Sequence, residues 1–153
     1  MIDTISTWKY AWYVSLNILL TETSNVWTNV VRFTSKPDSD WNQMGDRIPM
    51  LMIKENTNQL YVCTGLNDNP NHFDAPIILT LNQWTAIEVT QIQEGSKYYF
   101  IVNVDGDEVE KVENTKPQMF SDVKVYLSDN FWEPAKAMVQ NLTYYNLPEG
   151  KIN

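Results

Sequence analysis

The fold is decided by the stretch KYYFIVNVDGDEVEKVE, residues 97–113. In residues 97–104 large apolar side chains fill alternate positions, which is the period of a β-strand with one buried face. Asp105 and Gly106 follow, and both residue types tolerate the positive φ angles of a two-residue turn. Residues 108–113 then interleave valine with charged residues. The stretch therefore predicts a hairpin of two antiparallel β-strands.

The same signals continue along the chain in both directions. Gly95 and Ser96 predict a second hairpin turn, so that residues 84–113 form three consecutive antiparallel strands. Strand-like runs, rich in β-branched and aromatic residues, occur at residues 8–20, 26–34, 49–54, 59–64, 76–81, 84–93, 97–104, 108–113, 123–128 and 137–145. Longer loops are expected at residues 35–48 and 65–75. The pattern predicts an all-β sandwich of two antiparallel sheets with almost no helix.

Size and charge exclude several classes of protein. The length of 153 residues predicts one domain, residues 1–153, with a core of roughly residues 8–147. The net charge is −8, and because there is no basic run we expect neither a nucleic-acid partner nor docking to acidic membranes. The apolar runs fall short of the about 20 residues that a membrane helix needs, so we expect no membrane insertion. The polar start MIDTISTWKY leads us to expect no signal peptide in this chain.

One cysteine and one histidine limit the chemistry further. Cys63 alone cannot form an intramolecular disulfide, a cysteine-based zinc site or an iron–sulfur cluster. A Ser-His-Asp triad would have to be built around His72, which lies in the stretch NDNPNHFD with no serine or cysteine elbow nearby. We therefore expect His72 to be a solvated loop residue and not a general base.

Several segments, in order, resemble a known superfamily. They are WTNVVRFT (27–34), GDRIP (45–49), LTLNQWTAIEVTQ (79–91), YYFIVNVDGDEVEKVENTKPQMFSDVKVYLSD (98–129) and NL (141–142). The chain resembles, over roughly residues 10–147, the concanavalin A-like lectin and laminin-G-type jelly-roll superfamily, closest to extracellular jelly-roll modules of marine invertebrates. The resemblance implies a jelly-roll sandwich with binding loops at one edge, which in this superfamily often hold calcium.

Three glutamates raise the question of catalysis, because some glucanases of this fold use carboxylates that alternate along a strand. In a regular strand Glu108 and Glu110 share one face and Glu113 lies on the other, so the three cannot line one cleft without a bulge. We interpret them as charges on a solvated strand. We therefore predict that the chain is not an enzyme, and a glycoside hydrolase is the third choice of function.

Acidic loop residues suggest a cation site. Calcium prefers six to eight oxygen ligands from carboxylates, amides and carbonyls. The candidate ligands are Asp38, Asp40, Asp46, Asp68 and Asp74. Their spacing does not match an EF-hand, and the alternative is that they form turns, since Asp and Asn bond to nearby backbone groups. Calcium is the only cofactor that we expect.

Sugar binding needs an aromatic plate for stacking and polar groups for the hydroxyls. Trp41 and Trp132 lie in polar loops and are the candidate plates. Arg47 in GDRIP either donates to a ligand or, as we favour, anchors its loop through bidentate contacts. The other candidate ligand-binding residues are Asn69, His72 and Asp129.

The remaining tryptophans are expected to be structural. Trp12, Trp27 and Trp84 fall in strand-like runs, where each would bury a large ring in the core. For Trp84 this predicts that replacement by alanine costs about 3–5 kcal/mol.

A glycosylation sequon occurs at Asn141-Leu142-Thr143. It has meaning only in a secreted chain, and its position inside an expected strand argues against its use.

These observations favour a secreted, non-catalytic recognition module that binds a glycan or another surface ligand. Residues 35–48, 65–75 and 129–135 are expected to converge at one edge and to form the binding loops, with calcium as a helper. The alternative is a structural or assembly protein that uses its sheet faces for self-association, and homo-oligomers fit both interpretations.

Overall fold

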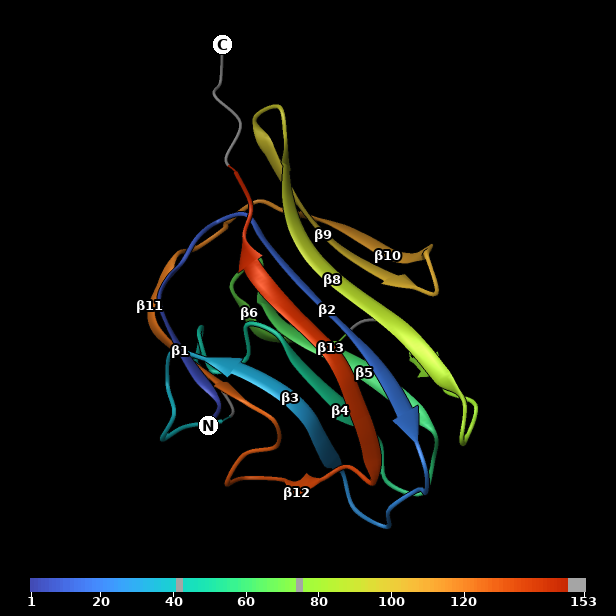
Figure 1. Cartoon of the computed structure of the whole chain (residues 1–153). Coiled ribbons are helices and arrows are strands. Elements are labelled where there is room, and N and C mark those ends of the chain that lie inside the picture. Colours follow the sequence, from blue (N-terminus) through green and yellow to red (C-terminus); the bar gives the residue numbers. More distant parts are fainter. Residues whose placement is uncertain (41–42, 74–75, 149–153) are drawn as a thin grey trace.

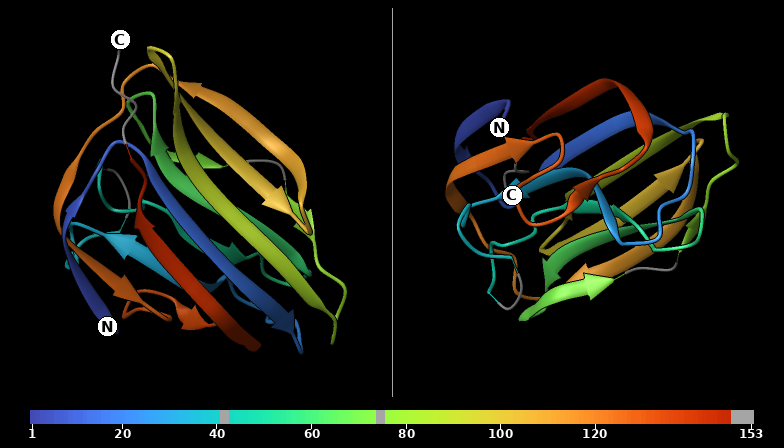
Figure 2. Two further views of the ribbon diagram at one scale, coloured as in Figure 1. Left: turned by 45° about the horizontal axis from the view of Figure 1, so that its top comes forward. Right: turned by 90° about the horizontal axis from the view of Figure 1, so that it is seen from below.

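The computed structural model describes residues 1–40, 43–73 and 76–148, and these form two β-sheets packed face to face (Figure 1). Sheet A has the strand order β1-β11-β3-β4-β5-β6, with β12 added to β3 and β7 added to β5. Sheet B has the order β10-β9-β8-β2-β13. All pairings are antiparallel except that of β12 with β3, which is parallel. Figure 2 shows the two layers from two further sides.

The strands have the following bounds. Sheet A contains β1 (Asp3–Trp8), β3 (Thr28–Thr34), β4 (Met50–Ile53), β5 (Gln59–Leu66), β6 (Asn69–Phe73), β7 (Ile77–Ile78), β11 (Phe120–Tyr126) and β12 (Glu133–Pro134). Sheet B contains β2 (Trp12–Leu20), β8 (Trp84–Glu94), β9 (Lys97–Val104), β10 (Asp107–Asn114) and β13 (Ala137–Asn146). More than half of the described residues are therefore in strands and none is in a helix, which confirms the all-β prediction. It follows that no helix able to cross a membrane occurs in this part of the chain.

Alternating apolar residues build the core between the sheets. In β2, Val14, Leu16 and Ile18 are at most 2% exposed, while the residues between them are only half-buried. In β9, Phe100 and Val102 are fully buried on the same inner face of sheet B. Since burial of such side chains is the main favourable term in folding, this alternation fixes which face of each strand turns inward.

The hairpin turns appear where glycine and aspartate predict them. Asp105 (φ +50°) and Gly106 (φ +91°) join β9 to β10, and Gly95 (φ +63°) joins β8 to β9. A third hairpin was not expected, because residues 65–75 read as a loop. There Asn67 (φ +53°) and Asp68 (φ +62°) make a tight turn between β5 and β6, so the prediction of a long loop is wrong.

The first expected strand, residues 8–20, corresponds to β2, whereas Trp8 ends β1, a strand of the other sheet that was not expected. β1 pairs with β11 in sheet A, and β2 pairs with β8 and β13 in sheet B. Trp8, at 1% exposed, closes the core at this crossing, with its ring 5.6 Å from that of Trp12 and 5.5 Å from that of Phe33. No glycine or proline lies between Trp8 and Trp12, so no local turn signal marks the crossing.

Two expectations about side-chain orientation are wrong. Trp84 is 39% exposed, because the inward positions of β8 are those of Ile87 and Val89 and its own position faces outward. In β10 the register shifts between Glu108, opposite Asn103, and Glu110, opposite Val102. This bulge turns the two glutamates to opposite faces, whereas strict alternation placed them on one.

Candidate functional site

The outer face of sheet A carries a second apolar cluster, separate from the core. Met50, Met52 and Cys63 are at most 1% exposed and pack with the half-buried rings of Trp27, Tyr61 and Trp132. These positions alternate with core residues such as Leu51 in β4, so the cluster and the core are the two faces of the same strands. The expectation that Trp27 is a core residue is therefore wrong, since it covers the outer face.

A pocket of about 330 Å³ opens on this cluster. We call it the aromatic pocket, and it is lined by Trp27, Arg47, Met52, Asn71, Phe73 and Trp132. Met52 lies in β4, and Asn71 and Phe73 lie in β6. Trp27 directly precedes β3, Trp132 directly precedes β12, and Arg47 lies between β3 and β4, so residues far apart in sequence meet on one face.

The rings of Trp27 and Phe73, which line the pocket, pack at large angles against each other and against Tyr61 of the cluster. The centroid of Trp27 lies 5.5 Å from that of Tyr61, at 49°, and 6.4 Å from that of Phe73, at 74°. The rings of Tyr61 and Phe73 are 6.0 Å apart at 73°. Such tilted and edge-on contacts are the favoured geometry for aromatic pairs, so the wall is preformed.

Arg47 is held in the wall by a buried carboxylate. Its Nε donates to Asp40 Oδ1 at 3.0 Å and its Nη2 to Asp40 Oδ2 at 3.4 Å, and the two residues are 3% and 2% exposed. The guanidinium carbon lies 5.8 Å from the centroid of the Phe73 ring. The bidentate contact ties Arg47 to Asp40, as the favoured interpretation of GDRIP as a loop anchor predicted.

Arg32 is a buried cation that sequence reasoning missed. It is fully buried in β3, its Nε donates to the carbonyl oxygen of Asp46 at 3.0 Å, and its Nη1 donates to Asp129 Oδ2 at 3.2 Å. Its Nη2 lies 3.6 Å from Asp40 Oδ1. The position of Arg32 inside an apolar strand was a signal that could have been used. An arginine at such a position is seldom buried without an anionic partner.

The same two aspartates orient Trp132. Asp129 Oδ1 accepts from the backbone N–H of Phe131 at 2.9 Å and of Trp132 at 3.1 Å, which is the turn that aspartate side chains favour. The indole N–H of Trp132 donates to Asp40. Through Asp40 and Asp129, described residues from two of the three loops that were expected to converge are joined, whereas the third is a hairpin.

The β5–β6 hairpin contributes to the site by its second strand and not by its tip. Asn71 and Phe73, which were not predicted as ligand-binding residues, line the pocket from β6. Asn69, which was predicted, is exposed at the start of the strand, where the register shifts and places it opposite Leu66. The tip turns away, and Asn67 Nδ2 donates to the carbonyl oxygen of Glu113 at 2.8 Å. Phe73 was missed because the segment read as a polar loop.

His72 points to the other face of β6, into the space between the sheets, so the expectation that it is a solvated loop residue is wrong. Its Nε2 lies 3.8 Å from Glu110 Oε1, and its ring is 6.3 Å from that of Phe100. The structure therefore does not bring His72 together with Arg47 and Trp132 in the aromatic pocket. Trp41 lies outside the described residues.

The candidate calcium ligands are scattered. Asp40 faces two arginines, and Asp46 Oδ2 accepts from Ser39 Oγ at 3.2 Å and from the Gln43 backbone N–H at 3.1 Å. Asp68 forms an ion pair with Lys116, and Asp38 is exposed. Asp74 lies outside the described residues. Within residues 1–40, 43–73 and 76–148, no group of three or more His, Cys, Asp or Glu is placed to hold a metal, so calcium at this edge stays a prediction.

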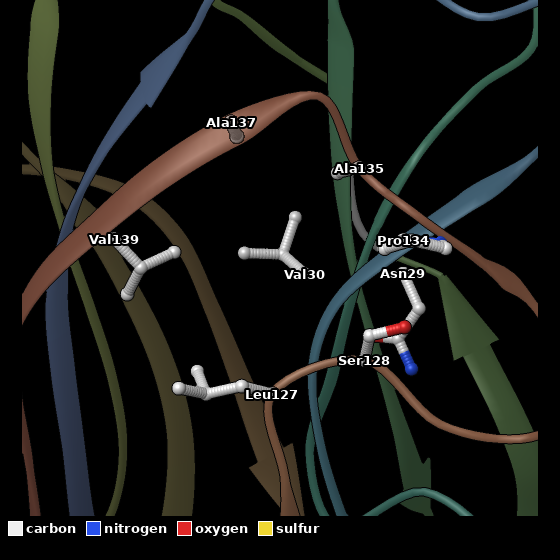
Figure 3. Close-up of a pocket in the computed structure, with 8 residues that line it drawn as sticks. All are labelled: Asn29, Val30, Leu127, Ser128, Pro134, Ala135, Ala137 and Val139. Carbon is white, nitrogen blue, oxygen red and sulfur yellow. The ribbon is translucent and has the colours of Figure 1, made fainter.

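A second hollow, of about 240 Å³, opens between the edges of the two sheets (Figure 3). Val30, Leu127 and Val139 face its opening, with Asn29 and Ser128 at the rim. Its walls are aliphatic, and none of its lining residues is aromatic, so it lacks the plate on which a sugar ring stacks.

The two sheets and their strand order define a concanavalin A-like jelly-roll sandwich. The chain is similar in structure to a native heptameric SAP-like pentraxin from Limulus polyphemus, with a TM-score of 0.63, 13% identity and coverage of 96% of this chain and 69% of that one. It is similar to a variant of human galectin-16 (TM-score 0.54, 10% identity, 94% and 93% coverage). It is also similar to the alginate lyase AlgAT5 of polysaccharide lyase family 7 (TM-score 0.56, 15% identity, 94% and 63% coverage).

At these identities the likeness concerns the fold alone. The sequence matches no protein-family model, and no curated protein matches it. Of these three structures, one is a pentraxin, one is a galectin and one is a lyase.

Proposed function

We propose that this chain is an extracellular, non-catalytic recognition module that binds a glycan in the aromatic pocket. The observation that carries the proposal is the pocket itself, in which the rings of Trp27, Phe73 and Trp132 lie beside the amide of Asn71 and the guanidinium of Arg47. An aromatic ring matches the apolar face of a sugar, and amide and guanidinium groups match its hydroxyls.

Arg47 can serve the ligand and the fold together. A guanidinium has five N–H donors, and the contacts with Asp40 use only Nε and Nη2 of this side chain. The pairing also fixes the plane of the group, so little side-chain freedom is lost when a ligand binds.

The carboxylates beside the pocket support binding over catalysis. A general acid or base must be able to exchange its proton with the substrate. Asp40 is held by Arg47 and by the indole of Trp132, and Asp129 is held by Arg32 and Asn29. The oxygens of both carboxylates are thereby occupied by structural partners. The similar galectin and pentraxin structures favour the same choice, and the similar lyase makes an enzyme the competing one.

A glycan array on which the wild type and two tryptophan variants are compared tests the proposal. We expect Trp27→Ala to weaken binding to the preferred glycan at least tenfold, and the matched control Trp84→Ala, an exposed tryptophan on sheet B, to bind as the wild type does. Equal binding by Trp27→Ala and the wild type would remove the aromatic pocket as the site. A Trp27-dependent oligomer without glycan binding would favour the assembly function instead.

A further inference from the structure

The outer face of sheet B, on the far side of the sandwich from the aromatic pocket, carries a hollow of about 300 Å³. We call it the sheet B groove. Most of its lining side chains are polar, namely Tyr13, Ser15, Asn17, Glu88, Asn103 and Asn141. None of these residues takes part in the aromatic pocket.

Strand register brings the polar groups into one row. Glu88 in β8 lies opposite Ser15 of β2 on one side and opposite Asn103 of β9 on the other. In the next row Ala86 lies opposite Asn17. Because alanine is the only short apolar side chain there, the surface is hollowed beside the row of polar groups.

Glu88 is fixed by two hydrogen bonds. Its Oε2 accepts from the Tyr13 hydroxyl at 2.8 Å, and its Oε1 accepts from Asn103 Nδ2 at 2.7 Å. A carboxylate has about four lone-pair positions, so each oxygen can accept one bond more. A hydrogen bond with Ser15 lowers the pKa of the Tyr13 hydroxyl, but burial and the Glu88 carboxylate outweigh it and raise that pKa above 10.0. Tyr13 therefore stays a neutral donor, and Glu88 is held ready as an acceptor.

Tyr13, the one aromatic residue among those that line the groove, is backed by a second ring. The rings of Tyr13 and Tyr145 stack with centroids 4.9 Å apart at 22°, and Tyr145 is 48% exposed. The stack is held by strand register, in which the two tyrosines are direct partners. Tyr145 does not line the groove itself but supports the Tyr13 ring, whose hydroxyl donates to the fixed carboxylate.

An irregularity in the edge strand β13 adds an amide. The register of β13 with β2 shifts between Gln140 and Thr143, and Asn141 has φ +57° and is exposed. Asparagine adopts this conformation more readily than most residues, and such bulges redirect a side chain. The bulge thus places Asn141 in the groove wall.

We propose that the sheet B groove is a second saccharide-binding site, independent of the aromatic pocket. Its ligand is a neutral oligosaccharide, whose hydroxyls donate to Glu88 and exchange hydrogen bonds with Asn103 and Asn141, while a sugar ring packs on Tyr13, which Tyr145 holds in place. A saccharide that carries carboxylates is disfavoured, because Glu88 repels it and the chain has a net charge of −8.

The test is a two-dimensional ¹H–¹⁵N NMR titration of the full chain, produced without N-glycosylation because a glycan on Asn141 would fill the groove. The probes are cellohexaose, laminarihexaose, maltohexaose and mannohexaose, with trigalacturonate as the acidic comparison. We expect at least one neutral hexasaccharide to shift the amide signals of residues 13–17, 86–88 and 103, and trigalacturonate to shift them at least fivefold less at equal concentration.

Two variants separate this site from the aromatic pocket. Glu88→Gln keeps the shape of the side chain and should weaken the groove titration at least fivefold, and Tyr145→Ala should do the same. Glu94→Gln, an exposed glutamate of the same strand, is the matched control and should leave it unchanged. The inference fails if no neutral hexasaccharide shifts the groove signals, or if both variants titrate as the wild type does. Shifts at Asn71 and Phe73 report the aromatic pocket separately, so either site can fail alone.

Discussion

Replacing Asp40 by asparagine tests whether buried ion pairs hold the loops of the aromatic pocket. Asp40 is 2% exposed and neutralises Arg47, which is 3% exposed, at 3.0 Å. Removing one partner of a buried pair costs about 3–5 kcal/mol, because the other charge stays buried without compensation. Arg32 keeps its contact with Asp129 at 3.2 Å, so only one arginine loses its partner. We therefore expect Asp40→Asn to lower the free energy of unfolding by about 3–5 kcal/mol, and not by twice that amount.

Urea unfolding followed by tryptophan fluorescence measures this loss. The matched control is Asp122→Asn, which removes an ion pair with Lys124 at 2.6 Å in which the aspartate side chain is 73% exposed. Exposed pairs contribute about 0–1 kcal/mol, so the control should unfold almost as the wild type does. A loss below about 1 kcal/mol for Asp40→Asn would show that the buried network does not anchor the loops. A loss seen only when calcium is present would assign Asp40 to a metal.

Three further predictions concern the core, the alkaline limit and the metal. Trp8→Ala should cost about 3–5 kcal/mol in urea unfolding, because Trp8 fills the core, whereas Trp84→Ala should cost about 1 kcal/mol or less, and equal losses would contradict the observed burial. Burial and a hydrogen bond to Asp3 raise the pKa of Tyr144 from 10.0 to about 12, so its contribution to stability is complete below pH 10 and is lost as the pH rises toward 12. Melts across this range should fall more steeply for the wild type than for Tyr144→Phe, and parallel curves would refute the assignment. If calcium binds the edge loops, a hundredfold excess over its Kd adds about 2.7 kcal/mol, and a melting temperature that millimolar calcium and a chelator leave unchanged would remove the metal hypothesis.

Local sequence patterns predicted the parts of the fold that depend on local interactions. The β8-β9-β10 meander follows from turn residues such as Gly95 and Gly106 and from alternation inside each strand. The outward position of Trp84 could also have been found, since Ile87 and Val89 set the inward positions of the same strand. Trp84 was assigned to the core because of the size of its ring, and the alternation of the strand was given less weight.

The rest of the fold depends on contacts between distant residues. The bulge at Glu108 and Glu110 shows only when β10 is paired with β9, because nothing in the segment itself marks an extra residue. Likewise, the break after Trp8 appears only when the chain is divided between two sheets.

The candidate site was predicted in part. Arg47 and Trp132 were recognised as loop residues with binding chemistry, and both line the aromatic pocket. Trp27 was assigned to the core and Phe73 to a polar loop. No local pattern distinguishes an apolar residue on the outer face of a sandwich from one on the inner face. The role of Asp129 depends on Arg32, which is 97 positions away in the sequence.

The most direct test of the central claim is an NMR titration with the glycan preferred on the array, followed through the indole N–H signals. The account predicts that the signals of Trp27 and Trp132 shift during saturation, whereas those of Trp8 in the core and Trp84 on sheet B stay in place. Saturation by that glycan with the signals of Trp27 and Trp132 unmoved would contradict the account, because the ligand would then bind outside the aromatic pocket.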